Sequence, residues 1–135
     1  MQIYKYLLKF DIKPSVQRTA VMDYLMQHKT HPTIDEIYSS LSPNMPTLSK
    51  TTIYNTLNLF VQKGAVLQLA IDEKNARYDA DIKDHAHFMC KHCGKVSDIF
   101  DLSSDLFTKP SFMDFDVHTV EISYSGICSD CKNPN

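Results

Sequence analysis

The sequence lacks any apolar run approaching the roughly 18–20 residues that a membrane-spanning helix needs. Its first ten residues, MQIYKYLLKF, are amphipathic and have no plain apolar core of the kind found in signal peptides. No internal repeat, low-complexity tract or βαβ pattern is present either. These absences predict a cytoplasmic protein with reduced thiols, because disulfides are rare in that compartment.

The chain also lacks a strong net charge, but its charges are unevenly divided. The net charge is −2, which by itself argues against nucleic-acid binding. Residues 1–64 contain seven Lys and Arg against four Asp and Glu, whereas residues 65–135 contain seven against twelve. This asymmetry suggests a first half that faces nucleic acid and an acidic second half that attracts cations. A length of 135 residues allows one domain or two small ones.

The four cysteines form two C-x-x-C pairs with 34 residues between them, and none is left over: Cys90, Cys93, Cys128 and Cys131. Two thiolates three residues apart on a tight turn bind one ion from two sides, and two such turns complete a tetrahedral zinc site. The alternatives are two disulfides or a redox-active pair. Neither has support in a chain without a signal peptide or a βαβ pattern. The cysteines therefore predict structural zinc.

A second group of metal-ligand types surrounds the first cysteine pair. In an extended segment His85 and His87 lie on the same face, because side chains alternate along a strand. If residues 96–100 return as the second strand of a hairpin, Asp98 lies across from His87. Two imidazoles and a carboxylate suit Fe(II), Mn(II) or Zn(II). The alternative is a packed or solvated histidine pair.

The first half of the chain reads as four helices followed by a hairpin. Residues 2–10 have apolar residues at helical spacing, and the next three helices begin at Ser15, Thr33 and Ser49, which are N-cap residues. The fourth helix runs to about Lys63, with Gly64 at its end. Strands over 65–71 and 77–81 then form a wing. Together these elements predict a winged helix-turn-helix.

Two helices of this domain carry side chains suited to DNA. Arg18 lies in the first turn of the second helix, within reach of a phosphate. The fourth helix presents hydroxyl and amide groups that match base edges and phosphates in a major groove: Thr51, Thr52, Tyr54 and Asn55. The alternative is an ordinary solvated polar face.

The second half reads as a small α/β unit. We expect a hairpin around the first cysteine pair, a short helix over 103–108 and a long strand over 115–127. An edge strand in so small a sheet is a ready dimer surface. The predicted fold is α+β: a winged helix domain at residues 1–80, a hinge at 81–84, and a zinc-stapled α/β dimerisation domain at 85–135.

These pieces resemble the ferric uptake regulator (Fur) family of metal-dependent repressors over nearly the whole chain. The matching motifs, in order, are His31-Pro32-Thr33, Thr52-Ile53-Tyr54-Asn55-Thr56-Leu57 with Gly64, Arg77-Tyr78-Asp79, Asp84-His85-Ala86-His87, Cys90-x-x-Cys93-Gly94-Lys95 and Cys128-x-x-Cys131. The resemblance implies a homodimer that binds a palindromic operator when a regulatory metal is bound, and no enzymatic activity.

The resemblance also implies residue roles. Tyr54 falls on the base-contacting tyrosine of the recognition helix, and the four cysteines fall on the structural zinc. The regulatory metal ligands are implied to be His31, Asp79, His85, His87 and Asp98. One ion held by all five residues would set the angle between the two lobes and favour the DNA-binding arrangement.

Three features resemble the peroxide-sensing (PerR) branch of this family: Asp98 in place of glutamate, Asp79 six residues before His85, and Asn55 where iron-sensing members usually have arginine. In that branch, bound Fe(II) reacts with hydrogen peroxide and a ligand histidine is oxidised, which releases DNA. The sequence departs from many iron-sensing members at Ala86, which leaves Asp105 and His118 as candidates for a further, minor metal site. We expect His118 to be a partly buried strand residue.

Other functions stay open at this stage. The regulatory site also suits an iron or zinc uptake regulator. A small non-haem iron enzyme would use His85, His87 and Asp98 as a facial triad, but the winged helix would then have no role. A zinc-ribbon interaction module explains the cysteines alone.

Overall fold

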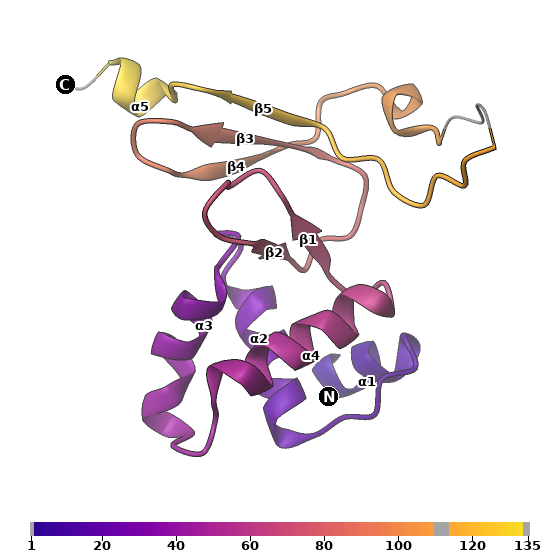
Figure 1. The fold of residues 1–135 in the computed structure, drawn as a ribbon, viewed down its shortest axis with the longest axis vertical. Coiled ribbons are helices and arrows are strands. Elements are labelled where there is room, and N and C mark those ends of the chain that lie inside the picture. Colours follow the sequence, from indigo (N-terminus) through magenta and orange to yellow (C-terminus); the bar gives the residue numbers. More distant parts are fainter. Residues whose placement is uncertain (1, 110–113, 134–135) are drawn as a thin grey trace. The chain divides into compact units, whose positions relative to one another are not determined.

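The computed structural model describes residues 2–109 and 114–133. The chain forms two compact units, Met1–Ile82 and Lys83–Asn135. We call them the N-terminal and C-terminal units and describe each by itself (Figure 1). Their fold is α+β, with helices concentrated in the first unit and the larger sheet in the second. Within the described ranges, no helix is long and apolar enough to cross a membrane.

The N-terminal unit begins with a series of helices whose capping residues match those expected from the sequence. They are α1 (Gln2–Lys9), α2 (Val16–Gln27), α3 (Ile34–Leu41), the short 3₁₀ helix η1 (Ser42–Asn44) and α4 (Lys50–Gln62). The predicted N-caps of α2, α3 and α4 are confirmed, since Ser15, Thr33 and Ser49 each accept the backbone N–H three residues on. Gly64 follows α4 with φ +82°, the left-handed conformation that glycine tolerates best.

A single apolar core holds these helices together. Leu7, Val21, Ile37, Ile53 and Leu57 are fully buried in it, one or more from every α-helix of the unit. On α4, Phe60 is buried as well, and Val61 is partly buried against the core. Packing of these apolar faces supplies most of the stability of helices this short.

The predicted wing is present as a short antiparallel hairpin. Strand β1 (Leu67–Leu69) pairs with β2 (Arg77–Asp79) in the register Gln68 opposite Tyr78. Both strands are shorter than the predicted 65–71 and 77–81. Tyr78 is buried in the core cluster and so anchors β2 to the helices.

The C-terminal unit is a three-stranded sheet with strand order β4-β3-β5. Strand β3 (Ala86–Cys90) pairs antiparallel with β4 (Val96–Ile99) and parallel with β5 (Ser123–Gly126). The 3₁₀ helix η2 (Ser104–Phe107) follows β4, and α5 (Ser129–Lys132) follows β5. Strand β5 therefore lies at an edge of the sheet (Figure 1).

Two predictions for this unit were wrong. The long strand over 115–127 is reduced to β5, because its ladder with β3 runs only from His87 to Cys90; just before β5, the Ile122 carbonyl oxygen still accepts the His87 N–H at 3.1 Å. His118, predicted to be a partly buried strand residue, is exposed and outside any strand. The segment 103–108 forms one 3₁₀ turn, which is the usual form of so short a helix. Pro110, expected to stop this helix, lies outside the described residues.

Candidate functional site

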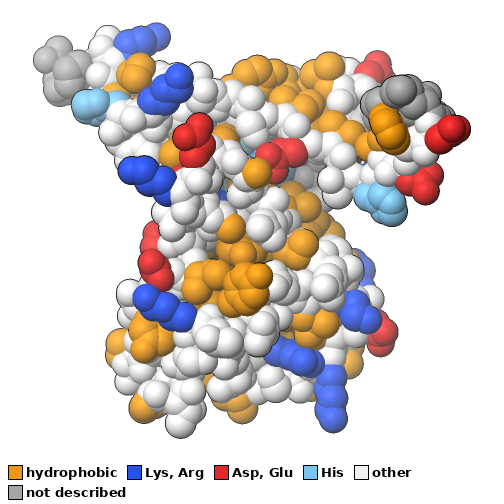
Figure 2. Space-filling model, viewed as in Figure 1, with side chains coloured by type: hydrophobic (Ala, Val, Ile, Leu, Met, Phe, Trp, Pro, Cys, Tyr) orange, Lys and Arg blue, Asp and Glu red, His pale blue; other side chains and the backbone are white. Residues whose placement is uncertain are grey.

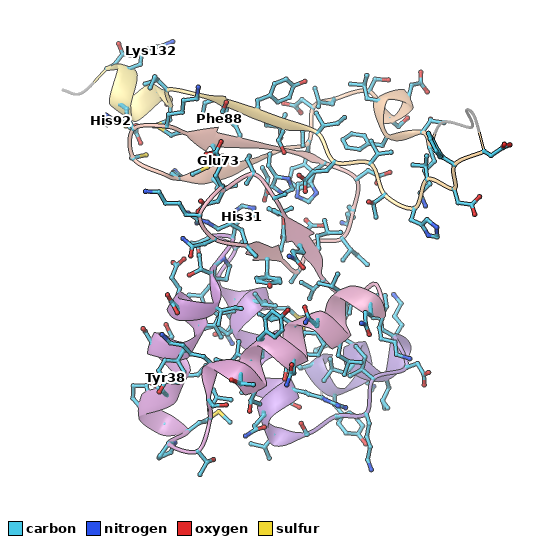
Figure 3. The ribbon with its side chains drawn as sticks, viewed as in Figure 1. His31, Tyr38, Glu73, Phe88, His92 and Lys132 are labelled. Atoms are coloured by element: carbon cyan, nitrogen blue, oxygen red, sulfur yellow. The ribbon has the colours of Figure 1, made fainter. Side chains whose placement is uncertain are left out.

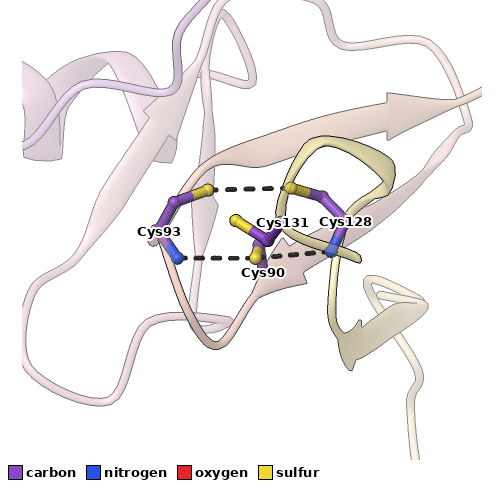
Figure 4. A group of neighbouring side chains, drawn as sticks. All are labelled: Cys90, Cys93, Cys128 and Cys131. Atoms are coloured by element: carbon purple, nitrogen blue, oxygen red, sulfur yellow. Dashed lines mark hydrogen bonds between the residues drawn. The ribbon is translucent and has the colours of Figure 1, made fainter. Parts of the chain in front are cut away.

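The four cysteines come together at one end of the C-terminal sheet (Figure 4). Cys90 ends β3, Cys93 lies in the turn before β4, and Cys128 and Cys131 bracket the start of α5. All four are free thiols, and their sulfurs lie within 4.8 Å of one another. The structure therefore contains no disulfide between these cysteines, against the alternative of two disulfides.

The sulfur spacing fits a tetrahedral ion. With metal–sulfur bonds of about 2.3 Å, the edge of a regular tetrahedron is about 3.8 Å. The Sγ atoms of Cys93 and Cys128, which come from opposite knuckles, are 3.8 Å apart. Gly94 has φ +79°, which lets the turn after Cys93 close tightly.

Backbone dipoles prepare this cluster for a cation. The N–H groups of Cys93 and Cys128 each donate to Cys90 Sγ at 3.4 Å, and together they lower the pKa of Cys90 to about 5. The hydrogen bond with Cys128, together with burial, raises the pKa of Cys131 to about 12. One thiolate is therefore stabilised while another thiol is kept protonated. A divalent cation is what allows all four to be thiolates at once.

A second cluster in the C-terminal unit joins β3 and β4. Residues His87 and Asp98 are opposite each other in the β-ladder, which confirms the predicted register. The Nε2 atoms of His85 and His87 lie 3.1 and 3.3 Å from the same carboxylate oxygen, Asp98 Oδ1. Both imidazoles are buried, and their ring centroids are 4.4 Å apart.

The hydrogen bonding of His85 shows that this cluster needs a positive charge. Its Nδ1 lies 2.6 Å from the Lys83 carbonyl oxygen, which only accepts, so Nδ1 carries the hydrogen. In the neutral ring Nε2 is then an acceptor that faces another acceptor, the carboxylate of Asp98. Either a proton or a metal ion relieves this repulsion. A histidine whose Nδ1–H donates to a carbonyl is the usual arrangement for a metal ligand.

Residues outside the predicted set also position His85. The ring of Phe100 stacks on the His85 ring with centroids 4.6 Å apart and planes 21° apart. The Phe100 side chain is itself more than half exposed, which is unusual for a large aromatic. Sequence reasoning missed Phe100 and Lys83 because neither is a ligand type.

The N-terminal unit contains its own histidine–carboxylate pair. His31 Nε2 lies 3.4 Å from Asp79 Oδ2, and both side chains are almost completely buried. Asp79 Oδ1 accepts the backbone N–H of Asp81 at 2.9 Å. Each unit therefore holds nitrogen and oxygen donors suited to a first-row divalent ion.

A polar groove lies between the start of α2 and the outer face of α4. Among the described residues that line it, none is acidic: Lys13, Pro14, Ser15, Gln17, Arg18, Thr52, Asn55, Thr56 and Leu59. Arg18 Nη1 donates to the Lys13 carbonyl oxygen at 2.8 Å, which holds the guanidinium beside the groove. Lys13 was missed from sequence. Its position just before a capped helix is the signal that was available.

The other predicted DNA-binding residues differ in exposure. Thr51, Tyr54 and Asn55 are exposed on α4, with Tyr54 at 51%. Thr52 is half-buried, and its hydroxyl lies 3.0 Å from that of Ser49. The exposed polar face of α4 therefore consists of Thr51, Tyr54 and Asn55, with Thr52 at its margin.

Comparison with known proteins settles the family. The model of the ferric uptake regulator family matches residues 9–125. The chain belongs to this family. The peroxide-responsive repressor PerR of Staphylococcus epidermidis is 37% identical over 128 residues, which span 93% of this chain and 85% of that protein. PerR of Staphylococcus aureus (strain Mu50) is 36% identical over 124 residues, which span 90% and 84%.

Solved structures of Fur-family proteins show a similar fold. PerR from Streptococcus pyogenes, studied for peroxide sensing and gene regulation, is 30% identical, with a TM-score of 0.54 over 96% of this chain and 90% of that one. Fur from Helicobacter pylori is 22% identical, with a TM-score of 0.66 over 98% and 90%. Fur-family proteins are DNA-binding, dimeric regulators and not enzymes, so the facial-triad enzyme considered above is set aside.

The candidates for a minor Fur-type metal site are not assembled in the described part of the chain. Asp105 lies in η2 and His118 in the segment before β5, and both are exposed. Neither belongs to a group of three or more potential ligands among residues 2–109 and 114–133.

Proposed function

We propose that this protein is a metal-dependent transcriptional repressor that senses peroxide. The observation that carries the proposal is the cluster of His85, His87 and Asp98, in which imidazole nitrogens and a carboxylate oxygen converge and a bound metal ion would relieve the repulsion between acceptors. The similarity to peroxide-responsive repressors of staphylococci supports the choice of branch.

The two clusters have different chemistry and so suit different ions. Four cysteine sulfurs at tetrahedral spacing favour Zn(II), which we propose as the structural ion. Imidazole and carboxylate donors suit Fe(II) or Mn(II), which we propose as regulatory ions. We further propose that His31 and Asp79 bind the same regulatory ion as His85, His87 and Asp98. An ion that binds donors of both units favours the one arrangement in which all of them reach it.

We propose that DNA is bound by α4 and by the groove beside it. Thr51, Tyr54 and Asn55 would contact base edges in the major groove, and Arg18 with Lys13 would contact phosphates. A homodimer matches a palindromic operator whose half-sites are about one helical turn, roughly 34–36 Å, apart. Such a protein works where the DNA is, in the cytoplasm.

The C-terminal unit offers a surface for this dimer. Strand β5 is an edge strand, and several large apolar side chains around the sheet are exposed: Phe100, Leu106, Phe115, Tyr124 and Ile127. Figure 2 shows apolar side chains gathered at the surface of this unit. An exposed edge together with apolar side chains is what a partner strand would cover.

The arrangement of His85, His87 and Asp98 places a histidine ring where it could be oxidised. Bound Fe(II) would activate hydrogen peroxide, and the ring that is oxidised would supply the two electrons that the peroxide takes up. His85 and His87 are held against Asp98, so a ring is next to the site where peroxide reacts. Insertion of one peroxide oxygen into a ring, with the other leaving as water, changes the imidazole's donor properties. Loss of a ligand then lowers the affinity for the ion and for DNA.

Mass spectrometry tests the peroxide-sensing part of this proposal. Protein loaded anaerobically with Fe(II) should gain one oxygen atom after a small dose of peroxide on the peptide with His31 or the peptide with His85 and His87. Protein loaded with Mn(II) should not. The peptides with His92 and His118 are internal controls, because both side chains are exposed and neither belongs to a cluster.

Together with a measurement of DNA binding, the same experiment distinguishes a peroxide sensor from an iron or zinc uptake regulator. No histidine oxidation, with DNA binding still dependent on Fe(II), would indicate an iron uptake regulator. DNA binding that responds only to added Zn(II) would indicate a zinc uptake regulator. If the peptides with His92 and His118 were oxidised as much as those with His31, His85 and His87, oxidation would not be specific to the proposed metal site.

A tyrosine variant tests the recognition face. Tyr54→Ala should weaken binding to the operator by about ten- to a hundredfold, because one good base contact contributes about 1–3 kcal/mol of discrimination. Binding to a scrambled duplex should change little. Fluorescence anisotropy with both duplexes measures the two affinities.

A matched control is available on α1. Tyr4 is 49% exposed, close to the 51% of Tyr54, and does not line the groove. Tyr4→Ala should leave both affinities unchanged. Equal losses of affinity for operator and scrambled DNA in Tyr54→Ala would mean that Tyr54 reads no base.

A further inference from the structure

The backbone of His31 has an uncommon conformation. Its φ is +57°, in the left-handed region that residues with a Cβ rarely adopt. Such a conformation persists only where surrounding contacts hold it. In the N-terminal unit, contacts to this segment come from three consecutive residues of β2: Arg77, Tyr78 and Asp79.

Arg77 makes the first of these contacts. Its Nη1 donates to the His31 carbonyl oxygen at 3.3 Å, and the next N–H along β2, that of Tyr78, donates to the Pro32 carbonyl oxygen at 3.1 Å. Two consecutive carbonyls of the segment that bears His31 are therefore held by two consecutive residues of β2. Asp79, the neighbour of the His31 ring, follows directly.

Asp72 orients Arg77 and shapes the wing loop, which we define as residues 70–76. Asp72 Oδ2 accepts from Arg77 Nε at 3.0 Å, and Asp72 Oδ1 accepts the backbone N–H of Lys74 at 2.9 Å. Only 9% of the Asp72 side chain and 16% of the Arg77 side chain are exposed. The ion pair is therefore well shielded from water, unlike most surface pairs. Figure 3 labels Glu73 in this loop and His31 in the N-terminal unit.

We propose that Asp72 and Arg77 are positioning residues for His31, and that through them metal binding orders the wing loop. The path is continuous: Lys74 N–H to Asp72, Asp72 to Arg77, and Arg77 to the carbonyl of His31. The inference rests on the proposed function of His31 as a metal ligand. The inference adds a second effect of the regulatory ion: within the N-terminal unit, the ion would order the wing loop before DNA is bound.

Charge and positioning predict opposite results for Arg77→Met. Removal of a cation near a cation site, which also leaves Asp72 without its counter-charge, should tighten Mn(II) binding if charge alone matters. Loss of the hydrogen bond that holds His31 should weaken Mn(II) binding instead. Outer residues that orient metal ligands typically contribute 10- to 100-fold in affinity. We therefore expect about a tenfold loss.

The experiment uses the full-length zinc-loaded protein and measures Mn(II) affinity by competition with a fluorescent chelator. The variants are Arg77→Met and Asp72→Asn, which keeps an oxygen for the Lys74 N–H but weakens the bond to Arg77. Lys74→Met is the matched control, because it removes a positive charge from the same loop but keeps the backbone N–H through which Lys74 bonds to Asp72. His31→Ala tests the underlying function. Zinc content and the melting temperature show which variants are folded.

Hydrogen exchange provides a readout that simple loss of stability would not reproduce. Mn(II) should increase the protection of the wing-loop amides in the wild type and in Lys74→Met, but not in Arg77→Met or Asp72→Asn. If Arg77→Met binds Mn(II) as tightly as the wild type or more tightly, or still shows loop protection, the inference is wrong. If His31→Ala binds Mn(II) normally, the proposed function of His31 is wrong, which is a separate result.

Discussion

Replacing Cys90 by serine is expected to remove the proposed structural zinc and unfold the C-terminal unit. Cys90 is fully buried, and its sulfur accepts two backbone N–H groups that hold both knuckles together. A structural zinc contributes roughly 10–16 kcal/mol of apparent binding free energy. That exceeds what a core of about 50 residues supplies alone. Elemental analysis should show loss of zinc, and exchange of the β3 amides should become fast.

The N-terminal unit should survive this change because it has its own core. Circular dichroism of Cys90→Ser should therefore keep a helical melting transition, while operator binding falls below detection for lack of a dimer. His92→Ala is the control, since His92 is exposed in the same turn between the two ligands. A Cys90→Ser protein that retained zinc and its β3 protection would exclude the four-cysteine site as the structural element.

Replacing His31 by alanine is expected to lower metal-dependent operator affinity by at least about a hundredfold, while zinc content stays unchanged. A buried member of the proposed regulatory set is lost, which leaves Asp79 as the one proposed donor that joins the ion to the N-terminal unit. Anisotropy titrations with operator DNA at fixed Mn(II) measure the effect. Affinity without metal should be equally weak in wild type and variant.

His28→Ala is the matched control for this experiment. His28 lies three residues earlier in the same unit, and its exposed ring stacks on Tyr24 with centroids 4.1 Å apart. Its removal should leave metal-dependent binding as in the wild type. Loss of zinc from His31→Ala would show that the regulatory and structural sites are not separate.

Local features of the chain were predictable because short-range chemistry decides them. The N-caps Ser15, Thr33 and Ser49 each need only a backbone N–H three residues away, and all three are present. The placement of Asp98 opposite His87 follows from strand alternation and the length of the turn between the cysteines. The extent of the last strand was not predictable, because it depends on how much of β3 is available for pairing.

The assignment of roles to the five regulatory ligands stays a prediction, carried by the family to which the chain belongs. His31 illustrates why spacing alone does not reach it. Its neighbour Asp79 lies 48 positions later in the sequence, and the two meet only because β2 pairs with the segment at Pro32. His118 illustrates the reverse case. It has the residue type of a ligand but ends up exposed, away from any ligand group within the described residues.

The amino-acid sequence by itself determined the helix starts, the wing, the four zinc-type ligands and the pairing of His87 with Asp98. For the helix starts, the wing and the His87–Asp98 pair, the partners are close in the chain or repeat at a fixed period, and each cysteine pair is marked by its own C-x-x-C spacing. The tertiary structure alone decided the parallel pairing of β5 with β3, the groove that joins Lys13 and Arg18 to α4, and the path from Asp72 through Arg77 to His31. These depend on packing between distant segments, whose geometry no local pattern records.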